Sequence, residues 1–227
     1  MSLSAYDSSC GILEGVMTQQ KKEKLLVLDL DHTLFNTTIF VRDLQKRFAR
    51  DFDISPDDFM KYRNEVKACC TVIDVDLFVE HLPNPDKEAM HAAILDTLEK
   101  KGKEYLYTDV IPFLSKAEKE YEIIILTHGD TELQHAKIAS TGLDAHGRNI
   151  ISLENKSDAL ESCMDGYEEV NFVDDKVMHI DDIKQTFPNV RTYLIVRPED
   201  SPYASQASTC DCADVTIPSL HDILKKT

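Results

Sequence analysis

The chain has 227 residues, enough for one domain of ordinary size with a modest insertion. Its net charge of −16, from 41 acidic and 25 basic residues, disfavours nucleic acid and anionic membranes as partners, because both would repel it. Hydrophobic residues make up 42%, and no apolar run approaches the roughly 18 residues that span a bilayer. We therefore expect a globular protein without a membrane anchor.

The first 20 residues are rich in serine and lack the basic start and apolar block of a secretory signal. We expect a flexible arm over residues 1–20 and a cytoplasmic protein. The six cysteines are too few for a disulfide scaffold, and two of them, Cys69 and Cys70, are adjacent. We expect the cysteines to be reduced.

An apolar run, Leu25 to Leu28, leads directly into two carboxylates, Asp29 and Asp31. Such a run is typical of a parallel strand that is buried on both faces. Side chains alternate along a strand, so residues 29 and 31 should leave it on one side. Two carboxylates this close suggest a divalent cation or a shared proton, although they could also cap a turn in water.

Helical spacing follows this strand, beginning with Phe40, Leu44, Phe48 and Phe52. Roughly 70 residues then pass without a convincing strand, which is too long for a simple crossover between parallel strands. We therefore expect an inserted helical cap over residues 37–105.

Strands and helices alternate in the rest of the chain, which is typical of a parallel sheet. The apolar pattern predicts strands at 121–126, 149–153, 170–173, 190–196 and 213–217, and helices at 110–120, 131–141, 157–164, 177–187 and 219–225. The fold class is therefore α/β, a doubly wound and mainly parallel sheet of Rossmann-like type, with residues 21–36 and 106–227 forming the core.

Ligands of such sheets bind beyond the carboxyl ends of the strands. Three strands end in groups that suit phosphate and metal chemistry: Asp29 with Asp31, Thr127, and Asp174 with Asp175. Lys156 precedes a helix, where a cation is unfavourable unless it neutralises an anion. Taken singly, each has an ordinary alternative: a strand-end threonine, a surface lysine or a pair of helix-capping acids.

In the order of these residues the chain resembles the haloacid dehalogenase superfamily of phosphohydrolases. Asp29-Leu30-Asp31-His32-Thr33 matches the family's Asp-x-Asp-x-Thr, and three later motifs are matched by Thr127, Lys156 and Val173-Asp174-Asp175. The resemblance extends from about Lys24 to the carboxyl terminus. The helical block also lies where many members carry a cap.

The resemblance implies a Mg²⁺-dependent phosphatase that acts on a small phosphorylated metabolite. Asp29 would attack phosphorus and form an aspartyl-phosphate. Asp31 would protonate the leaving alcohol, and the neighbouring carboxylate should raise its pKa for this role. The acid at this position also argues against dehalogenase chemistry.

By the same resemblance, Mg²⁺ would be bound by Asp29, the backbone carbonyl of Asp31, and Asp175 or Asp174, with Asp175 preferred. Thr127 and Lys156 would hold phosphate oxygens. His128 is a further candidate phosphate contact, although strand alternation turns its side chain to the other side. Lys176 departs from the commonest family pattern, which leaves the details of the metal shell open.

Two alternatives stay open: a phosphotransferase or phosphomutase of the same family, and a binding module without turnover. Basic residues of the insertion could meet an anionic leaving group, but on exposed helix faces such residues usually serve solubility: Arg42, Lys46, Arg47, Arg50, Lys61, Arg63 and Lys67. We assign no substrate from them. The oligomeric state is also left open.

Overall fold

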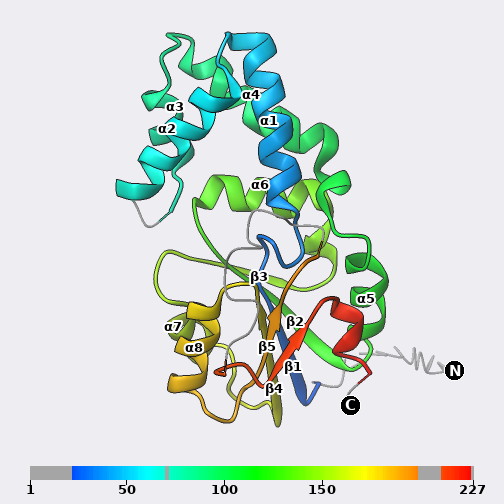
Figure 1. Ribbon diagram of the computed structural model, residues 1–227. Coiled ribbons are helices and arrows are strands. Elements are labelled where there is room, and N and C mark those ends of the chain that lie inside the picture. The colour runs from blue at the N-terminus through cyan, green and yellow to red at the C-terminus, as the bar shows by residue number, and fades with distance from the viewer. Residues whose placement is uncertain (1–21, 70–71, 199–210, 226–227) are drawn as a thin grey trace, which may run out of the picture.

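A single six-stranded sheet forms the base of the molecule (Figure 1). The computed structural model describes residues 22–69, 72–198 and 211–225, so the expected arm over residues 1–20 lies outside it. The strand order is β3-β2-β1-β4-β5-β6, and all five neighbouring pairs are parallel. The strands are β1 (Lys24–Leu28), β2 (Tyr121–His128), β3 (Arg148–Ser152), β4 (Glu169–Asp174), β5 (Arg191–Ile195) and β6 (Val215–Ile217). The predicted parallel α/β fold is confirmed.

Strand β1 lies between β2 and β4 and is covered on both faces. Leu26 and Leu28 belong to one apolar cluster, which also includes residues of the cap. Leu25 and Val27 belong to a second cluster on the other face. The uninterrupted apolar run is therefore explained by burial on both sides, and it brings the end of β1 to the middle of the sheet.

Helices flank the sheet on both faces, with α7 and α8 on one side and α5 on the other (Figure 1). The helices that follow the cap are α5 (Val110–Ala117), α6 (Thr131–Thr141), α7 (Lys156–Glu161) and α8 (Val177–Thr186), with short 3-10 turns η1 (Gly102–Tyr105), η2 (Leu143–Ala145) and η4 (Leu220–Asp222). Helix α6 begins at an Asp130 cap and ends at Gly142, whose φ of 77° is left-handed. These local signals placed the predicted helix 131–141 at its observed bounds.

Four helices lie beyond the carboxyl ends of the strands (Figure 1). They are α1 (Thr37–Phe52), α2 (Pro56–Cys69), α3 (Val75–His81) and α4 (Lys87–Lys101). Asn36, Asp74 and Asp86 cap three of them with side-chain oxygens. Edge-to-face contacts join Phe59 to Phe48 and Phe78, which link the first three helices through one aromatic cluster. We refer to α1–α4 as the cap.

The C-terminal segment and the cysteines differ from the predictions. The expected helix over 219–225 is only the η4 turn, because the Ser219 hydroxyl and the Leu220 amide donate to Asp109 instead, at 2.7 and 2.9 Å. The expectation of reduced cysteines holds for Cys69 and Cys163, which are free, and is wrong for Cys212, which is disulfide-bonded. Among the residues placed by the structure, no helix has the length and apolar character needed to cross a membrane.

Candidate active site

Asp29 follows β1 directly and lies in the middle of the sheet's carboxyl edge. Its backbone amide donates to the Val173 carbonyl of β4 at 3.0 Å, so the strand pairing continues to this residue. Its side chain is buried, and the residue is only 5% exposed. Burial raises the pKa of Asp29, and the Lys156 ammonium counteracts this in part.

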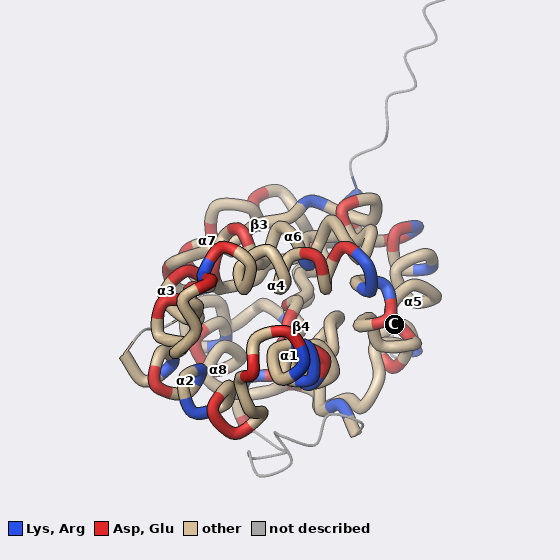
Figure 2. Tube along the Cα trace, turned by 90° about the horizontal axis from the view of Figure 1, so that it is seen from above, with Lys and Arg blue, Asp and Glu red and all other residues tan. Residues whose placement is uncertain are grey.

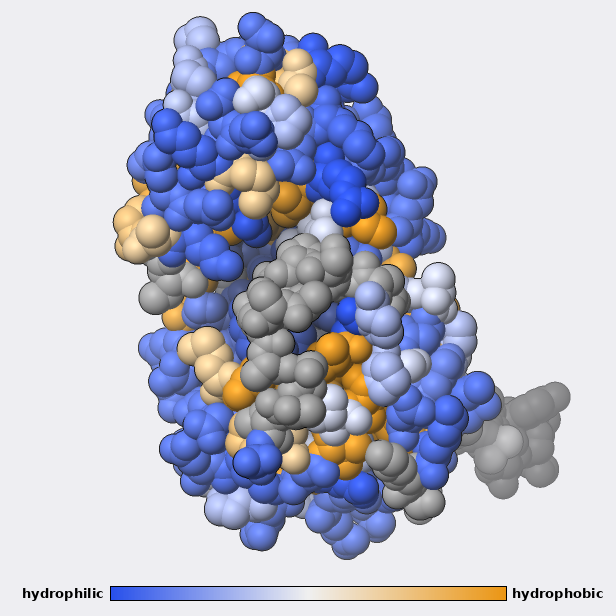
Figure 3. Space-filling model, in the orientation of Figure 1, coloured by the Kyte–Doolittle hydropathy of each residue, from blue (hydrophilic) through white to orange (hydrophobic). Residues whose placement is uncertain are grey.

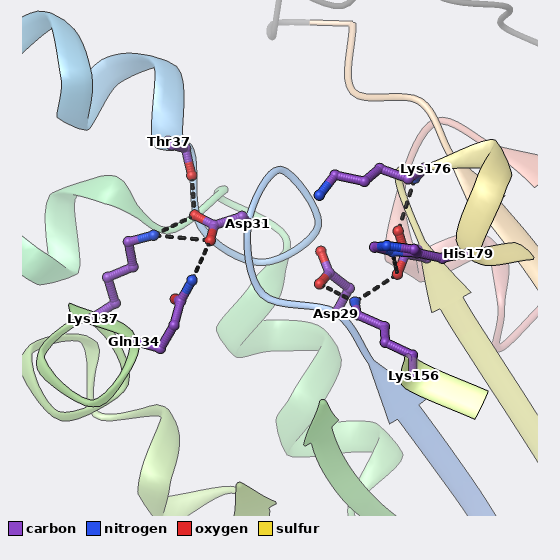
Figure 4. Close-up of polar contacts among 9 residues, drawn as sticks. Asp29, Asp31, Thr37, Gln134, Lys137, Lys156, Lys176 and His179 are labelled. Carbon is purple, nitrogen blue, oxygen red and sulfur yellow. Dashed lines mark hydrogen bonds and ion pairs between the residues drawn. The ribbon is translucent and has the colours of Figure 1, made fainter. Parts of the chain in front are cut away.

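Lys156 connects two of the carboxylates (Figure 4). It begins α7 and is 2% exposed, and its ammonium contacts Asp29 Oδ1 and lies 2.7 Å from Asp174 Oδ2. Burial would lower the pKa of Lys156, but the carboxylates of Asp174 and Asp29 raise it above the ordinary value. The lysine is therefore a buried cation that two acids stabilise, as expected for a lysine placed to neutralise an anion.

Asp174 is surrounded by donors. Besides Lys156, the backbone amide of Lys176 donates to its Oδ1 at 2.8 Å, and His179 Nδ1 lies 3.0 Å from its Oδ2. Burial alone would raise its pKa, but Lys156 and His179 lower it below the ordinary value. Sequence reasoning missed His179, which lies in the first turn of α8 and contacts Asp174. Both carboxylate oxygens of Asp174 therefore have partners, and they position Lys156, His179 and the backbone at Lys176.

Asp175 differs from Asp174 because its Oδ1 is buried without a hydrogen-bond partner within the described ranges. One carboxylate oxygen from each of Asp29, Asp174 and Asp175 lies within 4.8 Å of the others. Burial and the carboxylates of Asp174 and Asp29 raise the pKa of Asp175 well above its ordinary value. A group of three carboxylates fits a hard divalent cation, and Asp175, which has an unpartnered oxygen, is better placed than Asp174 to contact it.

Thr127 and His128 end β2 and point in different directions. Thr127 is 1% exposed, and its hydroxyl makes no hydrogen bond to any residue that the structure places. His128 lines the cavity described below, and burial lowers its pKa. A buried hydroxyl without a partner is rare and is expected where a ligand supplies the missing bond. This favours Thr127 as a ligand contact more than it favours His128.

Asp31 turns away from Asp29, on the opposite side of the loop (Figure 4). Its carboxylate accepts bonds from Thr37 Oγ1, from Gln134 Nε2 at 2.9 Å, and from Lys137 Nζ at 2.6 and 2.9 Å. Burial would raise its pKa, but Lys137 and the Thr37 hydroxyl lower it below the ordinary value. The predicted raised pKa is therefore wrong, because the nearest charge is an ammonium and not the carboxylate of Asp29.

Thr37, Gln134 and Lys137 were missed by the sequence reasoning. Gln134 and Lys137 are three residues apart on α6 and are both buried. The spacing of Gln134 and Lys137, which places them on one face of the helix that follows β2, is the one sequence signal that could have drawn attention to these two residues. None of the three donors could be assigned to Asp31 without the fold.

The loop after β1 is held firmly in place. His32 has a left-handed φ of 63°, and its amide donates to the Phe35 carbonyl at 2.7 Å. Arg197 donates from Nη2 and Nε to the Thr33 carbonyl, at 2.6 and 3.2 Å, and forms a bidentate pair with Asp109. The turn that carries Asp31 is therefore anchored through Arg197, which follows β5, to Asp109, which precedes α5.

A cavity of about 530 Å³ lies between the cap and the core. The cavity is lined by Asp31 and Lys176, which closely follow Asp29 and Asp175, and by His128, which follows Thr127. Its walls come from all four cap helices and from α6 and the start of α8. In the space-filling view, apolar surface lies between the cap and the core (Figure 3). A volume of this size suits a small-molecule ligand.

Fold and site together define a Rossmann-like α/β protein with a helical cap above an acidic strand-end site. No family model matches the chain, and no curated protein matches its sequence. Solved structures do match, and they give the chain the fold of the haloacid dehalogenase-like hydrolases.

A putative haloacid dehalogenase-like hydrolase from Burkholderia xenovorans superposes with a TM-score of 0.74 at 19% identity, over 91% of this chain and 97% of that one. A putative hydrolase of the same type from Bacillus subtilis, bound to magnesium, gives 0.64 at 13%, over 90% and 98%. A putative β-phosphoglucomutase from Thermotoga maritima gives 0.59 at 13%, over 90% and 99%. Dehalogenases are also among the matches.

Proposed function

We propose that the protein is a Mg²⁺-dependent phosphoric monoester hydrolase that acts on a small phosphorylated metabolite. The observation that carries this proposal is the convergence of Asp29, Lys156, Asp174 and Asp175 from separate strand and helix ends. The unpartnered hydroxyl of Thr127 adds a donor for a phosphate oxygen. The similarity to solved structures supports the fold only, and we infer the chemistry from these side chains.

Asp29 is the proposed nucleophile. One of its carboxylate oxygens attacks phosphorus, and the bond between phosphorus and the alcohol oxygen breaks. Water then attacks the phosphorus of the aspartyl-phosphate, which releases inorganic phosphate and restores the carboxylate. Lys156 holds Asp29 in place and neutralises phosphate charge, while Thr127 donates to a phosphate oxygen. Asp174 acts indirectly, since it fixes the position of Lys156.

Asp29 and Asp175 are the proposed side-chain ligands of Mg²⁺, with the backbone carbonyl of Asp31 as a third. Mg²⁺ would supply charge compensation for the phosphate as the carboxylate approaches. The unpartnered Asp175 oxygen supports this assignment. The relative from Bacillus subtilis is described as bound to magnesium, which agrees with the proposal.

Lys137 and Asp31 are proposed to protonate the leaving group together, with the Lys137 ammonium carrying the proton and Asp31 holding that ammonium in place. Both residues line the cavity, and Lys137 Nζ lies 2.6 Å from Asp31 Oδ1. Transfer of the ammonium proton to the leaving oxygen would leave a neutral Lys137 amine beside an ionised Asp31. The pair can therefore supply a proton although the pKa of Asp31 is low.

The proposal is tested with a panel of phosphorylated metabolites and Mg²⁺, with phosphate release as the readout. We expect activity in the parent protein and a loss of more than about a thousandfold in Asp29→Asn, as for removal of a nucleophile. Asp144→Asn is the matched control, because Asp144 is an exposed acid in the η2 turn that follows α6. Equal rates in the parent and Asp29→Asn would contradict the proposal.

A phosphotransferase or phosphomutase is the second candidate, favoured by the similarity to a putative β-phosphoglucomutase. It would pass the phosphoryl group from Asp29 to an acceptor alcohol faster than to water. If the protein is a phosphotransferase, added acceptor alcohols should therefore yield a new phosphate ester. Halide release from 2-chloropropionate would indicate dehalogenation, and no turnover of any aryl phosphate would favour a binding module.

The cellular location and the partners are further predictions. We propose a cytoplasmic protein that binds a small phosphate ester and neither nucleic acid nor membranes. The excess of acidic residues supports the second part, because it repels polyanions. Cell fractionation, and binding measurements with duplex DNA and anionic vesicles, test these predictions.

A further inference from the structure

The cavity between the cap and the core has a predominantly apolar wall. Phe40, Phe59 and Phe78 contribute aromatic rings from three cap helices. Further aliphatic residues complete the wall: Val41, Leu44, Val72, Ile73, Val75, Ile94, Leu133, Val177 and Met178. The side chains of this wall offer no hydrogen-bond partner to a ligand, so the wall favours an apolar body over a hydroxylated one.

The cap helices as a whole are much more polar than this wall. Figure 2 shows basic stretches on α1 and α2 among many acidic ones. None of the acidic residues that the structure places on the four cap helices lines the cavity. Five of the seven basic residues named in the sequence analysis do not line it either: Arg42, Lys46, Arg47, Arg50 and Lys61. The apolar wall is therefore a property of this one face of the cap.

Two basic residues of α2, Arg63 and Lys67, do line the cavity. Arg63 already has an interaction partner in the protein. The Lys67 side chain is exposed, and the carboxylate of Asp175 is among the charges that act on its ammonium. We therefore assign neither residue to the leaving group, and the apolar side chains are what the cap offers for its recognition.

The polar groups of the cavity that come from α6 belong to the proposed acid. Lys137 pairs with Asp31, and Gln134 donates to the same carboxylate at 2.9 Å. These three residues line the same enclosed space as the aromatic rings. An alcohol whose oxygen receives a proton from Lys137 therefore lies in the cavity, where its carbon skeleton contacts the apolar wall.

The volume of the cavity suits an alcohol with one or two rings. A cavity of roughly 150 Å³ is enough for one benzene ring. The cavity here measures about 530 Å³, which leaves space for a larger hydrocarbon body beside the ester oxygen. Burial of such a body stabilises the complex in proportion to the apolar surface that is removed from water.

We propose that the substrate is the phosphate monoester of an uncharged, apolar alcohol, and that the aromatic and aliphatic wall of the cavity binds this alcohol. The inference rests on the proposed phosphatase function, which it narrows to one class of phosphate ester. Phosphorylated sugars and other polyhydroxylated esters are poor substrates, because the wall leaves their hydroxyl groups without partners.

Two esters of similar size test the inference by turnover. Cyclohexylmethyl phosphate and glucose-6-phosphate are both esters of a primary alcohol on a six-membered ring, and they differ mainly in the ring hydroxyl groups. With Mg²⁺, kcat/KM should be about a hundredfold higher or more for the cyclohexylmethyl ester. Along a series of unbranched alkyl phosphates from ethyl to hexyl, kcat/KM should rise roughly fourfold for each methylene group.

Phosphonate analogues, in which a methylene group replaces the ester oxygen, measure binding without turnover. In calorimetry with Mg²⁺, the cyclohexyl analogue should bind roughly tenfold or more tightly than the glucose analogue. Its binding should also have a negative heat capacity change, which is the mark of apolar burial.

Two variants and one control assign the preference to the wall. Val41→Thr and Ile73→Thr each place a hydroxyl group at a partly buried position of the wall, and each should reduce the preference for the cyclohexyl compounds severalfold. Val215→Thr is the matched control, because Val215 is a partly buried valine of β6 that does not line the cavity. Melting temperatures show whether the three variants fold. If both wall variants fold and keep the full preference, the proposal is overturned.

The esters and the phosphonates together separate this inference from the proposed function. Phosphate release from glucose-6-phosphate as fast as from the cyclohexylmethyl ester refutes the apolar substrate class and leaves the phosphatase proposal standing. Selective binding of the cyclohexyl phosphonate without hydrolysis of any ester supports the apolar binding site and counts against the phosphatase. Failure to bind or hydrolyse any compound of either series counts against both.

Discussion

Replacing Lys137 with methionine removes the ammonium that pairs with Asp31 and keeps much of the apolar stem. Lys137 is 3% exposed and bonds to both oxygens of Asp31. Removal of one partner from a buried ion pair costs roughly 3–5 kcal/mol, because the other charge stays behind without its partner. The Asp31 side chain is 21% exposed and keeps Gln134 and Thr37 as donors. We therefore expect a loss of about 2–3 kcal/mol in the free energy of unfolding.

Urea denaturation at neutral pH measures this loss, and a double-mutant cycle with Asp31→Asn isolates the pair. The double variant should be more stable than the sum of the two single losses predicts, by roughly 1–3 kcal/mol. Lys100→Met is the control, because Lys100 forms an exposed ion pair with Asp96, and we expect its denaturation midpoint to stay nearly unchanged. Additive losses, or a Lys137→Met protein as stable as the parent, would refute the assigned pairing.

Three further predictions concern single groups. Thr127→Val should leave stability unchanged or slightly higher, since the lost hydroxyl has no partner, yet reduce kcat/KM roughly tenfold or more; an unchanged kcat/KM would exclude Thr127 as a phosphate contact. Burial would raise the pKa of Asp109, but the hydrogen bonds and the charge of Arg197 lower this pKa below its ordinary value. The ionised Asp109 therefore stabilises the folded protein above about pH 4, and this stabilisation is lost as the pH falls through the folded-state pKa. The stability gap between the parent and Asp109→Asn should therefore close in acid, and a gap independent of pH would contradict this. Mg²⁺ should raise the melting temperature of the parent. Without metal, Asp175→Asn should melt at a higher temperature than the parent, and added Mg²⁺ should raise its melting temperature by less. An equal increase in both proteins would remove Asp175 from the metal site.

The fold was largely predictable because its signals are local. The apolar run of β1 is buried on both faces, and the Asp130 cap and Gly142 define the ends of α6. The C-terminal segment was mispredicted as a helix because its backbone is bound by Asp109, 111 residues away from Leu220. A contact across such a distance leaves no periodic trace in the sequence.

The site was predictable in part for the same reason. Asp29, Lys156 and Asp174 meet as expected, because the carboxyl ends of parallel strands converge on one edge. The surroundings of Asp31 were not predictable, since Lys137 lies 106 residues away and reaches it only after α6 has docked. The sequence analysis likewise named seven basic residues in the insertion, and only the fold shows that two of them, Arg63 and Lys67, line the cavity.

The central claim is that Asp29 carries the phosphoryl group during turnover. The most direct measurement quenches the protein with acid during turnover of an aryl phosphate in Mg²⁺, and then reduces it with borohydride, which converts an aspartyl-phosphate to homoserine. Peptide mass spectrometry should locate homoserine at position 29 and nowhere else, and Lys156→Met should show far less of it. Phosphate release in the parent without modification at position 29, or with modification at another acid, would contradict the account.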